Sequence, residues 1–153
     1  MKKQRKKYER PLKKWDKARI ERERKLLKDF GLRRKKEIWR AEALLRKYRR
    51  MARELAAKRD KEKEKLLIKK LAKLGLLNEN ASLSDVLSLT VENILERRLQ
   101  TILTRKGLAN TPKQARQFIV HGHVKINNKK ISYPSYLVAK EEENKITVQK
   151  GGE

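Results

Sequence analysis

Cysteine is absent from this chain of 153 residues, and acidic and aromatic residues are scarce. Without cysteine the chain forms no disulfide, and it lacks the thiolate ligands of the commonest structural zinc sites. No apolar run approaches the ~20 residues that a membrane-spanning helix needs. The first residues are basic with no apolar segment behind them, so we expect no secretory signal peptide. These absences predict a cytoplasmic protein without membrane contact.

Acidic residues number 19 against 44 Lys and Arg, which leaves a formal net charge of +25. Such a charge repels itself in a compact fold and attracts a polyanion, for which nucleic acid and anionic membranes are the alternatives. Residues 1–75 carry 32 basic and 11 acidic side chains, whereas residues 76–153 carry 12 and 8. We therefore expect a densely positive front half, and a back half that is a folded domain with a selective basic face.

The front half is predicted to be a basic arm followed by a basic helical region, residues 15–89. Residues 1–14 contain too little apolar material for a core, so we expect a disordered arm. A helix is expected over residues 15–30, with Gly31 as its stop. Residues 38–55 carry apolar side chains at alternating intervals of three and four, which predicts a helix with one buried face. That face consists of Ile38, Ala41, Leu45, Tyr48, Ala52 and Leu55.

The stretch 58–65 is wholly charged, and apolar residues return after it at Leu66, Leu67, Leu71 and Leu74, with Gly75 as a cap. A solvated charged helix and a coiled coil are the alternatives to nucleic-acid contact for this region. An excess of positive charge stabilises neither structure, and the apolar stripe lasts under three heptads. We therefore favour phosphate contact for the front half as a whole.

The back half is predicted to contain a short helical piece at residues 85–89 and two longer helices. Thr90 is a good N-cap for the first, whose apolar stripe runs from Val91 to Leu103 and which Gly107 stops. Thr111 begins the second, with Pro112 at the first helical position and Gln114 completing a capping box. Gly122 ends it. The second helix is short enough to depend on tertiary packing.

After Gly122 the apolar period changes from helical to alternating, which predicts two short strands joined by a turn at Asn127-Asn128. Residues 137–138 and 146–148 are further strand candidates, with an acidic turn at residues 141–143 between them. The sequence therefore predicts an α+β fold. In it, a basic helical N-terminal region precedes a two-helix module with a small antiparallel sheet at residues 90–148, and residues 149–153 form a flexible tail.

No acidic residue interrupts the segment 105–131, so its outward face is expected to lie against phosphates. Tertiary contacts of the two helices would hold the donors in place, and the helix at 38–55 adds a second basic face. The candidate nucleic-acid-binding residues are Arg97, Arg98, Arg105, Lys106, Lys113, Gln114, Arg116, Gln117, His121, His123, Lys125, Arg46, Lys47, Arg49, Arg50 and Arg53.

His121 and His123 are the only histidines, and their spacing places both on one face of a strand. A zinc ion would need two further ligands, so we expect an RNA-contacting or structural role and no metal or other cofactor. The front half has no phosphate-binding loop of the P-loop type and no nucleophile with a neighbouring base. The chain is therefore not expected to be an enzyme or to bind a small-molecule substrate.

The string LERRLQTILTRKGLANTPKQARQFIVHGHVKINNKKI resembles the S-four RNA-binding domain family. The resemblance rests on Glu96, Arg98 and Leu99, on Ala109 and Thr111, on Ala115-Arg116 before Phe118-Ile119, and on His121-Gly122-His123-Val124. The flanking segments SLSDVLSLTVENILERRLQ and SYPSYLV are similar to the archaeal form of the ribosomal S-four family. Thr104 departs from the family pattern, where an aromatic residue is frequent, and the N-terminal cysteine cluster of some members is missing, which argues against zinc.

The resemblance implies a structural component of the small ribosomal subunit that binds the 5′ domain of its RNA and nucleates assembly. It also implies a place near the path by which messenger RNA enters, beside proteins of the S-three and S-five families. Related domains are appended to RNA-modifying enzymes and to an aminoacyl-tRNA synthetase, but these need a separate catalytic domain. A stand-alone S-four protein that binds stalled ribosomes or acts in stress is the alternative.

Overall fold

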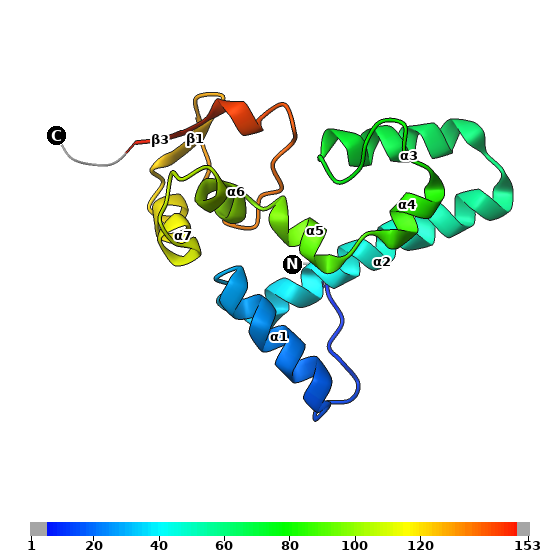
Figure 1. Ribbon diagram of the computed structural model, residues 1–153, viewed down its shortest axis with the longest axis horizontal. Helices are drawn as coiled ribbons and strands as arrows, with labels where there is room; N and C mark the ends of the chain where they lie inside the picture. The colour runs from blue at the N-terminus through cyan, green and yellow to red at the C-terminus, as the bar shows by residue number, and fades with distance from the viewer. Residues whose placement is uncertain (1–5, 150–153) are drawn as a thin grey trace, which may run out of the picture.

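The computed structural model describes residues 6–149, so residues 1–5 of the predicted arm and 150–153 of the predicted tail lie outside it. Helices dominate, and a small sheet lies near the C-terminus (Figure 1). The elements are α1 (Lys17–Asp29), α2 (Lys35–Lys58), α3 (Lys61–Lys73), α4 (Leu83–Ser88), α5 (Val91–Glu96), α6 (Leu99–Arg105), α7 (Pro112–Val120), β1 (Val124–Ile126), β2 (Lys129–Lys130), the 3-10 turn η1 (Glu143–Lys145) and β3 (Ile146–Val148).

The α2 helix is the axis of the first hydrophobic core, against which α1, α3, α4 and α5 pack (Figure 1). Five of the six residues of the predicted apolar stripe are buried, and Leu55 packs at the edge of the core. On α3, Leu67 and Leu71 are buried as expected, but Leu66 is 66% exposed. We call residues 17–96 the helical lobe.

Polar side chains just before the first helical residue set where several helices begin. Asp16 caps α1 by accepting from the Arg19 N–H, and Asp60 caps α3 by accepting from the Lys63 N–H. Thr90 and Asn93 form a reciprocal capping box at α5. The charged run is thus divided: Arg59 turns the chain in the left-handed conformation, and α3 begins inside the run.

The prediction of one helix from Thr90 to Gly107 is wrong, because the chain breaks between α5 and α6 at Arg97 and Arg98. The backbone there pairs with residues 136–138: the Leu99 N–H donates to the Tyr136 carbonyl, and the Val138 N–H donates to the Arg97 carbonyl. These hydrogen bonds replace those of a continuous helix. The strand candidate at residues 137–138 is accordingly a single bridge between Leu137 and Arg98.

A second core lies between α6, α7 and the sheet, and we call residues 97–149 the C-terminal module. The strands are antiparallel in the order β2-β1-β3, which confirms the α+β fold. Asn127 and Asn128 both have positive φ, as a tight hairpin turn requires. The two cores divide between Leu95 and Leu99, a few residues beyond the predicted domain boundary at residue 90.

The predicted start of α7 is confirmed in part. The Thr111 hydroxyl accepts from the Gln114 N–H, and Pro112 opens the helix. Gln114 does not complete a capping box, because its side-chain carbonyl accepts from the N–H of Asn110 instead. Within residues 6–149, no helix is both long and apolar enough to cross a membrane.

Candidate RNA-binding surface

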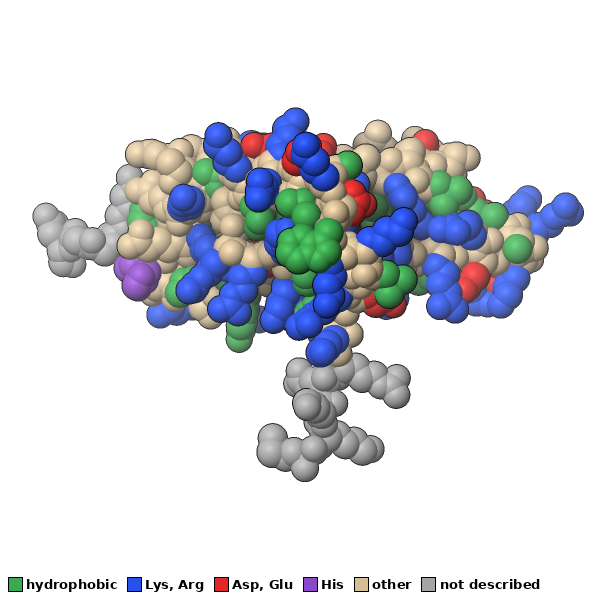
Figure 2. Space-filling view, turned by 90° about the horizontal axis from the view of Figure 1, so that it is seen from below, with side chains coloured by type: hydrophobic (Ala, Val, Ile, Leu, Met, Phe, Trp, Pro, Cys, Tyr) green, Lys and Arg blue, Asp and Glu red, His purple; other side chains and the backbone are tan. Residues whose placement is uncertain are grey.

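Basic side chains gather over one face of the molecule, which Figure 2 shows from below the view of Figure 1. Lys and Arg cover this face from the C-terminal module to the helical lobe, acidic side chains are few, and a histidine lies at the edge on the module's side. The arrangement offers a polyanion positive groups on both parts of the fold, with hydrophobic side chains between them at the middle of the face.

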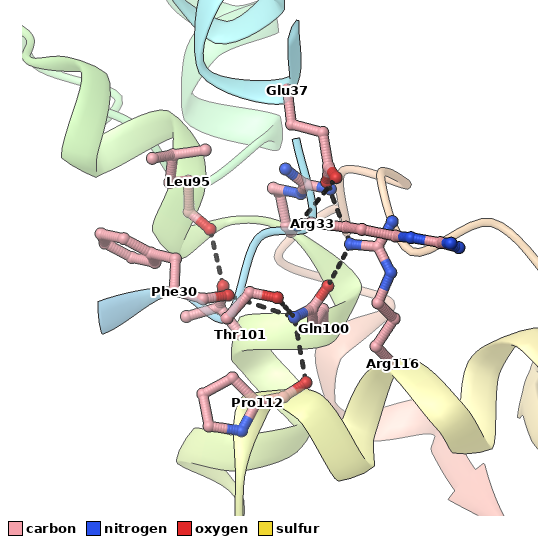
Figure 3. A network of polar contacts seen from close by, with 10 residues as sticks. Phe30, Arg33, Glu37, Leu95, Gln100, Thr101, Pro112 and Arg116 are labelled. Atoms are coloured by element: carbon pink, nitrogen blue, oxygen red, sulfur yellow. Dashed lines mark hydrogen bonds and ion pairs between the residues drawn. The ribbon is translucent and has the colours of Figure 1, made fainter. Parts of the chain in front are cut away.

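Glu37, in the first turn of α2, pairs with two arginines of the C-terminal module. One carboxylate oxygen lies 2.6 Å from the Arg98 guanidinium and 3.2 Å from that of Arg116. The other oxygen accepts from the backbone N–H of Arg33 at 3.2 Å. Figure 3 shows Glu37 of α2 and Arg116 of α7 pointing toward one another, and Arg98, just before α6, completes the set. Glu37 therefore links the helical lobe to the C-terminal module.

Gln100 forms a second link beside it (Figure 3). Its side chain is 1% exposed, and its amide nitrogen lies 2.9–3.1 Å from the carbonyl oxygens of Phe30, Gly31 and Pro112. The amide oxygen lies 3.5 Å from the Arg116 guanidinium. Gly31 is needed here, because a Cβ at its position would lie 2.6 Å from the Cβ of Pro112 and its φ is +57°.

The Glu37 network forms the floor of a hollow of about 470 Å³ that we call the arginine cleft. Glu37 is its one acidic residue, and both oxygens of that carboxylate already have partners. The positive charge of the lining is therefore largely unneutralised. The cleft is lined by Arg33, Arg34, Lys36, Glu37, Arg40, Arg98, Arg116, Pro134 and Ser135.

Four basic residues of the cleft were not among the candidates from sequence: Arg33, Arg34, Lys36 and Arg40. Part of the signal was available, since Arg33, Arg34 and Lys36 belong to a run of four consecutive basic residues between the Gly31 stop and the apolar stripe of α2. Arg40 lies within the stripe region and carried no such signal. A more apolar groove of about 750 Å³ continues from the cleft along α2 towards Lys47. The two hollows share Glu37, Arg40, Arg98 and Ser135.

Two predicted contacts at the break between α5 and α6 face inward instead of outward. Arg98 is 5% exposed and bound to Glu37, and the Arg97 side chain, 13% exposed, donates to Glu143 and to the Val138 carbonyl. Both residues lie at the break between α5 and α6, which turns them into the fold. Sequence reasoning placed them on the outside of a helix that does not continue there.

The α7 and β1 candidates lie on the module's surface. Lys113 and Gln117 are exposed one helical turn apart, whereas Arg116 leans into the arginine cleft and Gln114 is half-buried. His121 is exposed with His123 and Lys125 half-buried nearby, and the two imidazole rings lie 6.2 Å apart. Among residues 6–149, no three His, Asp or Glu side chains are grouped to hold a metal ion.

The remaining candidates lie at two other places. Lys106 and Arg105, at the end of α6, are exposed; Lys106 donates to the Glu143 carbonyl, and Arg105 lies 3.4 Å from Glu96. On α2, Arg46, Lys47, Arg50 and Arg53 are exposed. Arg49 is turned inward, because its guanidinium donates to the Leu89 carbonyl at 2.6 Å.

The protonation of Glu37 follows from its surroundings. Burial raises the pKa of its carboxyl, but hydrogen bonds and charges from Arg116 and Arg98 outweigh burial and hold that pKa below the ordinary 4.5. Burial also lowers the pKa of Arg98, although a guanidinium remains protonated at neutral pH. The network is thus an ion pair at neutral pH.

Comparison with known proteins places this surface in a family context. The family model of the S4 domain, the S-four domain of the sequence analysis, matches residues 97–144. A small ribosomal subunit protein uS4 from Nanoarchaeum equitans is 56% identical over 149 residues, covering 94% of this chain and 82% of the relative. Proteins of the same name from Korarchaeum cryptofilum and Picrophilus torridus are 52% and 51% identical, over 95% and 94% of this chain and 89% and 82% of the relatives.

Proposed function

The chain belongs to the uS4 family of small ribosomal subunit proteins, and from that premise we propose that it binds small-subunit ribosomal RNA as a structural component of the subunit. Its charge of +25 and the basic face in Figure 2 suit a polyanion. The prediction that the chain is not an enzyme is confirmed by its family. A stand-alone rescue or stress factor is not favoured, because the likeness covers nearly the whole chain.

The observation that carries the proposal is the arginine cleft. A-form RNA hides its base edges in a deep, narrow groove, so a protein reads it through the shape of its backbone. Positive side chains held at fixed separations on two walls of a cleft match phosphates that follow such a backbone. The walls here come from α2 and from the C-terminal module, so the fold itself sets their separation.

Direct contacts are assigned to the predicted residues that face solvent and to the newly found cleft residues. Arg97, Arg98 and Arg49 are proposed to act from within by holding the surface in shape. The proposed contacts are Arg105, Lys106, Lys113, Gln114, Arg116, Gln117, His121, His123, Lys125, Arg46, Lys47, Arg50, Arg53, Arg33, Arg34, Lys36 and Arg40.

The finer features implied by the resemblance are also proposals. They are binding to the 5′ domain of the RNA, early entry into assembly, and a place near incoming messenger RNA beside proteins of the S-three and S-five families. They include location on cytoplasmic ribosomes. Their support is the archaeal uS4 relatives and the exposed basic side chains on both the helical lobe and the C-terminal module.

Charge removal from the cleft tests the proposal against general attraction. Arg33 and Arg40 are exposed and line the cleft, whereas Lys61 and Lys63 lie on the surface of α3 outside it. Both double Ala variants lose two charges. Arg33→Ala with Arg40→Ala should weaken binding to a small-subunit 5′-domain RNA fragment far more than to an unrelated duplex, measured by filter binding at fixed salt. Lys61→Ala with Lys63→Ala should weaken both about equally. Equal losses for both pairs on both RNAs would refute a cleft-based site.

A further inference from the structure

We propose that Glu37 is a positioning residue for RNA binding, which joins the helical lobe to the C-terminal module so that their cationic side chains act as one surface of fixed shape. This inference rests on the proposed function. Under this inference the carboxylate of Glu37 increases the affinity for RNA, although both groups are negatively charged.

The geometry gives Glu37 this role. Its carboxylate accepts from the Arg33 N–H on its own lobe and pairs with Arg98 and Arg116 on the module, 61 and 79 residues later in the chain. Among the described residues, three ion pairs join the two parts, and two of them use Glu37. The third joins the exposed Arg105 to Glu96, the last residue of the helical lobe, at 3.4 Å. The other polar links include Gln100, the Thr101 hydroxyl, which donates to the Leu95 carbonyl, and a backbone hydrogen bond from the Lys140 N–H to the Lys73 carbonyl.

The arginines depend on the acid in turn. Arg98 is 5% exposed, and its Nε–H has no hydrogen-bond partner, so Glu37 is its counter-charge. Without that carboxylate, a buried guanidinium would remain near those of Arg116 and Arg40 with nothing to balance it. Breaking a buried pair by removing one partner is costly, and the module can relieve the repulsion by moving away from α2.

Two opposite outcomes therefore separate charge from position. Simple attraction predicts that Glu37→Gln, which removes one negative charge, tightens RNA binding. If Glu37 positions the surface, the same change widens the range of cleft shapes, and the RNA must restore the correct one on binding. The affinity for the matching RNA should then fall by roughly ten-fold, because ordering costs reduce affinity.

Glu21→Gln is the matched control. Glu21 is exposed on α1 and has no ion pair within the described residues, so its substitution makes the same charge change without touching the network. Filter binding at fixed salt would compare both variants on a 5′-domain fragment and on an unrelated duplex. We expect a roughly ten-fold loss for Glu37→Gln on the fragment alone, and no loss for Glu21→Gln. Equal behaviour of the two variants would overturn the inference.

A second measurement does not depend on RNA. The chain has no cysteine, so Ala57→Cys on α2 and Lys129→Cys on β2 would carry the only two spin labels. Glu37→Gln should broaden the distance distribution between them, and Glu21→Gln should not. An unchanged distance distribution in Glu37→Gln would refute the positioning role. This result is independent of the proposed function, which fails separately if the wild-type protein does not prefer the 5′-domain fragment to the unrelated duplex. If Glu37→Gln does not fold, Arg116→Gln keeps the Arg98 pair and should give a smaller broadening.

Discussion

The Glu37 carboxylate lies 2.6 Å from the Arg98 guanidinium, and this pair spans the division between the two hydrophobic cores. Arg98 stands at the break between α5 and α6, where the backbone pairs with residues 136–138. The pair thus ties the start of α2 to the point where the chain leaves the helical lobe. Any substitution that weakens this ion pair should therefore loosen the contact between the helical lobe and the C-terminal module.

Acid should weaken the fold in part through this carboxyl. Because the folded-state pKa of Glu37 is lowered, its stabilising contribution is present above its unfolded value near 4.5 and is lost as pH falls through the lower folded value. Glu37→Gln should therefore flatten the loss of stability below about pH 4.5. Urea unfolding midpoints measured from pH 3 to pH 7 would show this. A wild-type slope in Glu37→Gln would contradict the assignment.

Gly31→Ala should destabilise the protein more than Gly107→Ala. Both glycines have positive φ, which costs an alanine roughly 1 kcal/mol. At Gly107 an added Cβ meets nothing within 4 Å, whereas at Gly31 it would lie 2.6 Å from Pro112. The excess cost at Gly31 should be ~1–3 kcal/mol, as for an overpacked contact. Thermal unfolding of the two variants checks the order, and equal losses would show that the chain relaxes freely at the junction.

Gln100→Leu should destabilise the fold by roughly 2–4 kcal/mol, because it leaves buried carbonyl groups without a donor. The three carbonyls come from the α1 end and from the start of α7, so the loss should also loosen the junction. Gln117→Leu is the control, since Gln117 is exposed on α7 and should change stability by less than about 0.5 kcal/mol. Denaturant titration of both variants measures the difference. A small loss for Gln100→Leu would mean that water replaces its amide.

Deleting residues 1–14 should flatten the salt dependence of RNA affinity by several units in the log–log slope. These residues carry eight Lys and Arg, and each neutralised phosphate releases condensed counterions. Within the described part, the Tyr8 and Trp39 rings lie 6.0 Å apart and Glu9 pairs with Arg46, so residues 8 and 9 lie beside α2. That the arm is disordered without RNA stays a prediction, for which amide exchange is the measurement. An unchanged slope would show that the arm does not meet RNA.

The elements that sequence predicted well are those governed by local chemistry. The stripe on α2, the caps at Thr90 and Thr111 and the Asn127-Asn128 turn follow from spacing and backbone preference, which act over a few residues. The break at Arg97 does not, because nothing in LERRLQ disfavours a helix. It depends on hydrogen bonds with residues some 40 positions later, and a single sequence gives no sign of that pairing.

The same limit explains which surface residues were placed correctly. A helical face predicts that Lys113 and Gln117 point outward, and they do. It cannot predict that Arg116, the residue before Gln117, pairs with Glu37, 79 residues earlier in the chain. The basic residues 33–36 looked like part of a general charge excess. They became a candidate site only when the fold placed the start of α2 opposite α7.

The division between the two hydrophobic cores also determines the order in which the parts of the chain can fold during translation. The first core needs Ile94 and Leu95, so the helical lobe cannot close until α5 has emerged from the ribosome that makes the chain. Glu37 is translated before Arg98 and Arg116, so its two ion pairs can form only after those arginines have been synthesised. During that interval the nascent lobe carries the acid without its partners, and the finished surface exists only after α7 has been translated. The last contacts to form during folding are therefore the ones that complete the proposed RNA-binding surface.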